Sequence, residues 1–75
     1  MIVKFSRHAK RRAKLYKIPE ATIAETLKYL QLSEGEHEIV KDFPGLKFPV
    51  KMIITVKEEI VTVITNYPFK KGIKK

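Results

Sequence analysis

The chain has 75 residues, of which 16 are Lys or Arg and 8 are Asp or Glu, so its formal net charge is +8. A chain of this length buries about 60% of its unfolded surface, which leaves room for one small core and excludes a separate substrate domain. The absence of Cys excludes disulfides and thiol chemistry. No apolar run approaches the ~18 residues of a membrane span. The first residues also lack the apolar stretch of a signal peptide, so we expect a cytoplasmic protein with no membrane partner.

The first half of the chain has the signals of two helices. Residues 2–5 form a short extended segment, and Ser6 offers its side-chain oxygen to the first free N–H groups of a helix that runs to about Tyr16. Pro19 disfavours helical geometry in the residue before it and suits the first turn of a second helix, which ends before Ser33. Three apolar residues recur at helical spacing in this second helix: Ile23, Leu27 and Leu30. We expect a tight antiparallel helical hairpin.

The second half of the chain has the alternating pattern of strands. Strands are predicted over residues 37–43, 48–57 and 60–67. Glu58-Glu59 joins the last two, although this pair lacks the Gly or Asn that a two-residue hairpin loop prefers. If this pair is the loop, the apolar face of the hairpin has four cross-strand pairs: Val56 with Val61, Ile54 with Val63, Met52 with Thr65, and Val50 with Tyr67. Asn66 then lies on the other, more polar face.

These elements predict an α+β fold. We expect an N-terminal helical hairpin packed on a small antiparallel sheet of three strands, which residues 2–5 can extend by one short strand. The chain is expected to be a single domain, 1–75, with its core in residues 2–68. Residues 69–75 form a basic C-terminal tail without periodicity.

A helical wheel divides the first helix into a core face and a basic face. Ala9, Ala13 and Tyr16 share the core face. The basic face has five residues: Arg7, Lys10, Arg11, Lys14 and Lys17. Such a stripe suits sequence-independent contact with phosphate groups, and Lys51 on the sheet is a further candidate for guiding a nucleic acid. A helix face that is simply solvated has the same pattern.

His8 and Arg12 are i, i+4 neighbours at the boundary between these two faces. An imidazole there could act as a general acid or base near neutral pH, and a guanidinium could hold a phosphate through two hydrogen bonds. Purely structural roles fit them equally: His8 packing at the helix start, and Arg12 pairing with an acid. Tyr67 could direct its hydroxyl to a phosphate at the strand end, or be a core-edge residue with a solvated tip.

The remaining residue types give no sign of a metal or cofactor. The two histidines, His8 and His37, are too far apart in sequence for a zinc motif, and there is no Gly-rich phosphate loop. His37 has no obvious partner and is expected at the surface. No metal or cofactor is therefore expected.

Several short motifs in this order resemble a small prokaryotic family, domain-of-unknown-function family 4258. The motifs are Ser6-Arg7-His8-Ala9, Arg12, Ile18, the second amphipathic helix and the closing segment Val61-Thr62-Val63-Ile64-Thr65-Asn66-Tyr67-Pro68. The resemblance covers about residues 5–68, and the family is similar in size and layout to the RelE/ParE-like toxins of type II toxin–antitoxin pairs. RelE-type toxins cut messenger RNA on the ribosome with basic residues and often an aromatic hydroxyl, whereas ParE-type toxins act on DNA gyrase. The family motif maps onto His8, Ala9 and Arg12, and Tyr67 loosely matches the late aromatic residue.

The residues and the resemblance together predict a RelE-like RNA-binding protein or metal-independent endoribonuclease, with RNA a better fit than DNA. His8 would act as general acid or base or orient the phosphate, and Arg12 would stabilise the charge of the pentacoordinate phosphate, with Tyr67 beside them. The resemblance implies an antitoxin protein and the ribosome as partners. Two alternatives stay open: a non-enzymatic module that binds nucleic acid or an acidic partner, and a ParE-like toxin that acts on a protein.

Overall fold

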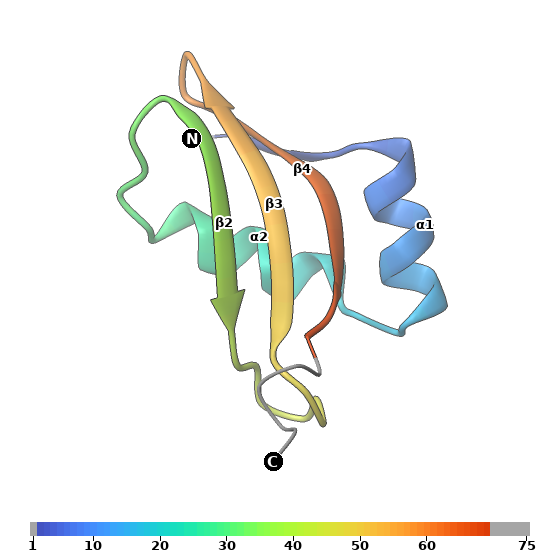
Figure 1. Cartoon of the computed structure of the whole chain (residues 1–75). Coiled ribbons are helices and arrows are strands. Elements are labelled where there is room, and N and C mark those ends of the chain that lie inside the picture. Colours follow the sequence, from blue (N-terminus) through green and yellow to red (C-terminus); the bar gives the residue numbers. More distant parts are fainter. Residues whose placement is uncertain (1, 70–75) are drawn as a thin grey trace.

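The computed structural model describes residues 2–69 as one mixed β-sheet with two helices. The elements in chain order are β1 (Ile2–Phe5), α1 (Arg7–Leu15), α2 (Glu20–Lys28), β2 (Gly35–Lys41), β3 (Val50–Lys57) and β4 (Ile60–Pro68). The strands are arranged in the order β1-β4-β3-β2. Helix α2 crosses one face of the sheet and α1 lies beside β4 (Figure 1). The predicted α+β class is confirmed, and residues 2–5 add the fourth strand.

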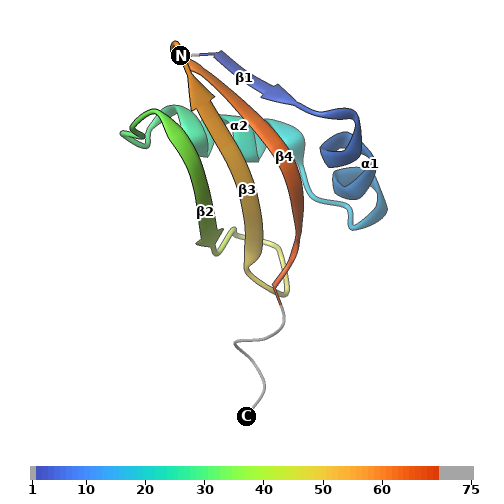
Figure 2. The ribbon, with the colours of Figure 1, turned by 45° about the horizontal axis from the view of Figure 1, so that its top comes forward.

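The sheet is mixed because β1 runs parallel to its neighbour. Ile2 lies opposite Ile60 and Phe5 lies opposite Val63, in a parallel register, whereas the other two strand pairs are antiparallel. Strands β1 and β2 form opposite edges of the sheet, and the two helices carry the chain from one edge to the other (Figures 1 and 2). β2 runs in the same direction as β1, and two successive strands of one sheet that run in the same direction need such a long crossover connection.

The tight antiparallel helical hairpin predicted from the sequence is wrong. Helices α1 and α2 lie at an angle to each other rather than side by side (Figures 1 and 2). Lys17 ends α1 in the left-handed conformation, with φ 57°, and the Ile18 N–H donates to the Ala13 carbonyl at 2.8 Å. Pro19 then starts α2 in a new direction. The buried side chains of α1 are Ala9 and Ala13, and both belong to the core.

The core lies between the helices and one face of the sheet. Its buried members are Ala9, Ala13, Ile18, Ile23, Leu27, Phe43, Val50, Met52, Ile54, Val56, Val61 and Val63. Alternate residues of β3 point into it, as the sequence predicts. Ile23 and Leu27 of α2 are fully buried, and burying a side chain of this size stabilises the fold by about 1.5–3 kcal/mol.

A β-bulge in β4 changes the predicted register of the hairpin. The predicted pairing is present up to Ile54 opposite Val63. The next pair is Ile53 with Thr65, which leaves Ile64 as an extra residue on β4. Because neighbouring residues of a strand alternate between faces, this single extra residue exchanges the faces of everything that follows it.

Two predicted pairs beyond the bulge are wrong: Met52 with Thr65, and Val50 with Tyr67. Asn66 lies opposite Met52 and faces the helices, where it is fully buried. Tyr67 lies opposite Lys51, so Tyr67 and Thr65 belong to the open face of the sheet, contrary to the prediction. The sequence of β4 does not reveal the bulge, because the group that stabilises it comes from the start of α1.

The predicted basic tail begins at a residue that the sheet holds in place. The Phe69 N–H donates to the Pro49 carbonyl at 2.7 Å, and the centroid of its ring lies 5.4 Å from Lys51 Nζ. The rest of the predicted tail, residues 70–75, lies outside the described residues.

The turn between β3 and β4 consists of two glutamates in the left-handed conformation. The φ angles are 51° at Glu58 and 65° at Glu59. Positive φ at both central residues is the geometry of a type I′ turn, in which Asn and Gly avoid a steric cost that other residues bear. The Glu58 N–H donates to Oε2 of Glu34 at 2.6 Å, which ties the turn to the segment before β2.

We expect Glu59→Gly to stabilise the protein, because glycine removes the steric cost of the left-handed conformation, about 1 kcal/mol. For a chain of this size the melting temperature would rise by about 4–8 °C, measured by circular dichroism. Glu36→Gly is the matched control: it makes the same change at an exposed position inside β2 and should lower the melting temperature. An unchanged or lower melting temperature for Glu59→Gly would contradict the prediction.

Candidate nucleic-acid interface

Ser6 fixes the start of α1 against the bulge in β4. The Ser6 N–H donates to the Val63 carbonyl at 2.9 Å, and the Ser6 hydroxyl donates to the Ile64 carbonyl at 2.8 Å. The same hydroxyl accepts a hydrogen bond from the Ala9 N–H at 3.0 Å, so Ser6 is the predicted N-cap of α1. One side chain therefore caps the helix and also supplies a partner for the carbonyl of the bulged residue.

Asn66 makes a second connection between β4 and α1. Its Nδ2 donates to the Ala9 carbonyl at 3.2 Å, and the side chain is fully buried. Its Oδ1 has no hydrogen-bond partner among residues 2–69. The bulge is what turns this amide towards the helix, so the two connections depend on each other. Together they set the position of α1 along the free edge of β4, beyond the end of β1.

A pocket of about 450 Å³ lies where α1 meets the end of β4. It is lined by Arg12 and Tyr16 from the helix side and by Tyr67 and Pro68 from the strand. Arg12 and Tyr67 are half-buried, whereas Tyr16 is 39% exposed. The pocket thus combines a guanidinium with two aromatic rings and their hydroxyl groups, a set that can bind a phosphate and a flat ring together.

The structure brings two of the three predicted catalytic residues together. Arg12 and Tyr67 line the same pocket, although Tyr67 belongs to the opposite face of the sheet from the one predicted. His8 does not line this pocket; it lies one helical turn before Arg12 and is exposed. Within residues 2–69, His8 makes no hydrogen bond or ion pair that would orient its ring.

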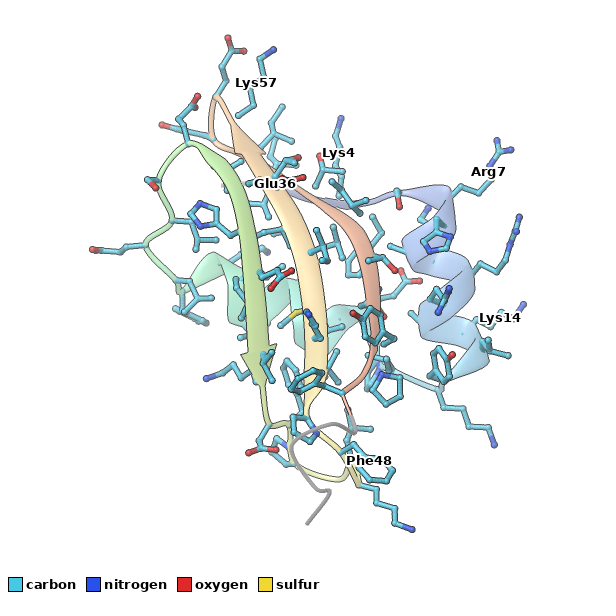
Figure 3. The ribbon with its side chains drawn as sticks, viewed as in Figure 1. Lys4, Arg7, Lys14, Glu36, Phe48 and Lys57 are labelled. Carbon is cyan, nitrogen blue, oxygen red and sulfur yellow. The ribbon has the colours of Figure 1, made fainter. Side chains whose placement is uncertain are left out.

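The residues of the predicted basic face are exposed on α1 and, for Lys17, just after its end, and this set is here called the α1 basic surface. Its members are Arg7, Lys10, Arg11, Lys14 and Lys17, and all five are exposed. None of them forms an ion pair within the described part of the chain, and α1 contains no acidic residue. Figure 3 shows Arg7 and Lys14 extending from α1 away from the sheet. These charges are therefore available to an anion in solution.

Lys51 is not part of the α1 basic surface. It is on the open face of the sheet, opposite Tyr67, and its Nζ lies 3.7 Å from Oε1 of Glu38. This ion pair, together with the Phe69 ring, partly satisfies its charge. His37 is likewise held within the fold, because its Nε2 lies 2.8 Å from the Ser33 carbonyl.

Tyr16 and Pro68 belong to the pocket, although the sequence pattern did not indicate either as a site residue. The helical wheel assigns Tyr16 to the core face, whereas the structure places it at the C-terminal cap of α1. A tyrosine at the last position before a Lys-Ile-Pro break lies at the end of a helix, where its ring can extend past the helix. The position of Tyr16 just before this break is the feature of the sequence that could have indicated it as a site residue.

Other kinds of site have no support in residues 2–69. No group of three His, Asp or Glu side chains is placed to hold a metal ion. Neither helix is long and apolar enough to cross a membrane.

Comparison with protein-family models, curated proteins and solved structures gives no match. The family resemblance therefore remains a prediction based on its motifs.

We expect Ser6→Ala to destabilise the protein by about 1–2 kcal/mol, because it removes a helix cap together with the partner of the Ile64 carbonyl. Thermal unfolding of the two proteins measures the difference. Ser33→Ala is the matched control, because Ser33 is exposed and accepts its hydrogen bond through the backbone. Equal melting temperatures for the two variants would show that the Ser6 hydroxyl does not hold the bulge.

Proposed function

We propose that this protein binds single-stranded RNA along α1, with phosphates on the α1 basic surface and one nucleotide in the pocket of Arg12 and Tyr67. The observation that supports this most directly is the pocket itself, which is lined by Arg12 and two tyrosines and lies beside cations that form no ion pair within residues 2–69. RNA of this kind is available in the cytoplasm, which is where we propose the protein acts.

The charge distribution favours a polyanion over a small neutral ligand. The formal net charge is +8, and four exposed cations of the nine-residue helix α1 are followed by a fifth, Lys17, just beyond its end. When protein cations contact phosphates, counterions are released from the nucleic acid. The resulting affinity for nucleic acid is sequence-independent and falls as the salt concentration rises. The α1 basic surface would therefore provide most of the affinity, and the pocket would determine the position of the strand.

The pocket favours a single strand over a duplex. A tyrosine ring can stack on a base only if the base is unstacked from its neighbours, as in single-stranded RNA. Arg12 would hold the adjoining phosphate through its guanidinium, and the ring of Tyr16 or Tyr67 would contact the base. A tyrosine hydroxyl can also bond a ribose 2′-hydroxyl, the group that distinguishes RNA from DNA.

Arg12→Ala should weaken binding of a fluorescently labelled single-stranded RNA by about 10- to 150-fold, because a hydrogen bond to a charged group contributes about 1.5–3 kcal/mol. Fluorescence anisotropy across a salt series gives both the affinity and its salt dependence. Lys28→Ala is the matched control, because Lys28 is an exposed cation at the end of α2. The proposal fails if the two variants bind equally well, or if affinity does not fall with salt.

Cleavage of the bound RNA is a second candidate function, favoured by the joint placement of Arg12 and Tyr67 in the pocket. The ribose 2′-oxygen would attack the adjacent phosphorus, and the 5′-oxygen of the next nucleotide would leave, giving a 2′,3′-cyclic phosphate and a 5′-hydroxyl. Arg12 would stabilise the pentacoordinate phosphate, and the Tyr67 hydroxyl would donate to it. The 2′-hydroxyl proton passes to a general base, and the leaving 5′-oxygen takes a proton from a general acid; His8 is proposed for one of these transfers, and water would serve the other. The family resemblance would make messenger RNA on the ribosome the target and an antitoxin protein the inhibitor.

Tyr67→Phe separates this second function from binding. It removes one hydroxyl but keeps the ring, so RNA affinity should stay within a few-fold of the wild type while cleavage falls by at least tenfold. Gel analysis of the RNA after incubation without metal measures the products. His8→Ala in the same assay tests the histidine: undiminished cleavage would exclude it from catalysis. Wild-type protein that binds RNA and leaves it intact would make the protein a binding module.

A further inference from the structure

A second pocket adjoins the first and has no role in the proposed function. Its volume is about 120 Å³. Its lining includes Tyr16, Ile18, Leu46, Phe48, Val50 and Pro68, with Lys47 also present. Tyr16 and Pro68 line both pockets, so the two pockets are neighbours on the surface.

The two pockets differ in chemistry. Ile18 and Val50 are almost completely buried in the second pocket, and Leu46 and Phe48 are half-buried. Lys47 is exposed, and its Nζ lies 5.8 Å from the centroid of the Phe48 ring. Figure 3 shows Phe48 at the end of the sheet where β3 begins. The second pocket is thus an apolar recess with an aromatic ring and a cation, whereas the first has a guanidinium and tyrosine hydroxyls.

The loop that forms this recess is held in place without a ligand. The Leu46 N–H donates to the Phe43 carbonyl at 3.2 Å, across the predicted Pro44-Gly45 turn, where Gly45 has φ 87°. At the other end of the loop, Pro49 accepts the hydrogen bond from Phe69. A recess that is already formed does not require ordering of the loop when a ligand binds.

We propose that the second pocket binds one unstacked base of an RNA strand whose adjoining phosphate lies at Arg12. A flat ring linked to a phosphate matches an apolar recess with an aromatic wall, a nearby lysine and a guanidinium in the next pocket. This inference rests on the proposed RNA binding and adds a base subsite to it. The two pockets then accommodate neighbouring nucleotides, with the shared Tyr16 ring between them.

The test combines a change in the RNA with a change in the protein. A single abasic nucleotide is moved along a short single-stranded RNA, and each version is titrated by fluorescence anisotropy. With wild-type protein, we expect one position at which loss of the base weakens binding by roughly 5- to 150-fold, the range for loss of one stacked base. Phe48→Leu keeps an apolar side chain but removes the ring. This variant should bind the intact RNA more weakly than the wild type does. Removing the base at the sensitive position should then cause almost no further loss of affinity.

Phe5→Leu is the matched control, because Phe5 is a half-buried phenylalanine on β1 that packs against the core and lines neither pocket. It should keep the full effect of the abasic position. A second measurement does not depend on how any variant folds. RNA with 5-iodouridine at the sensitive position is irradiated with wild-type protein, and the attached peptide is identified by mass spectrometry. Attachment at Tyr16 or within residues 46–48 is expected.

The outcomes separate this inference from the function on which it rests. If wild-type protein binds no RNA at low salt, the proposed function fails and the base subsite fails with it. If RNA binds and depends on Arg12, but every abasic position is equivalent, the base subsite alone is wrong. It is also wrong if Phe48→Leu keeps the full abasic effect, or if the crosslink lies outside these residues.

Discussion

The fold depends on one hydroxyl group that joins three elements. Ser6 follows β1 directly, caps α1 and donates to the Ile64 carbonyl at the bulge in β4. A bulged residue leaves the regular ladder of the sheet, so its carbonyl needs another partner. Because Ser6 supplies that partner, the bulge, the buried orientation of Asn66 and the position of α1 form one connected arrangement. The pocket between Arg12 and Tyr67 lies at its far end.

The sequence predicted those features that depend on neighbouring residues. The Ser6 cap, the break before Pro19 and the alternation along β3 are local patterns, and each is present in the structure. The features that it did not predict depend on contacts between distant segments. The bulge requires a donor 58 residues away in the sequence, and no pattern within β4 indicates it. The helix crossing depends on the left-handed Lys17, a conformation that the sequence would suggest only for glycine or asparagine.

The candidate site likewise has features that follow from local sequence and features that follow from contacts between distant segments. The α1 basic surface follows from helical periodicity, and all five of its members are exposed, four on α1 and Lys17 just after its end. The joint position of Arg12 and Tyr67 follows from tertiary structure, because the bulge determines which way Tyr67 points. Tyr16 shows the limit of a helical wheel, which treats the last residue of a helix as though another turn followed. Phe48 and Leu46 come from a loop, where periodicity has no meaning.

The absence of acidic residues in α1 affects the folding of the helix as well as its surface. Arg7 lies four residues before Arg11, and Lys10 lies four residues before Lys14, so like charges face each other along the helix. Each such pair costs about 0.2–0.5 kcal/mol, and Arg7 also opposes the positive end of the helix dipole. The packing of the buried alanines and the Ser6 cap stabilise α1 against the repulsion between its own positive charges. A bound polyanion would relieve this repulsion, so ligand binding and local helix stability are thermodynamically linked through α1.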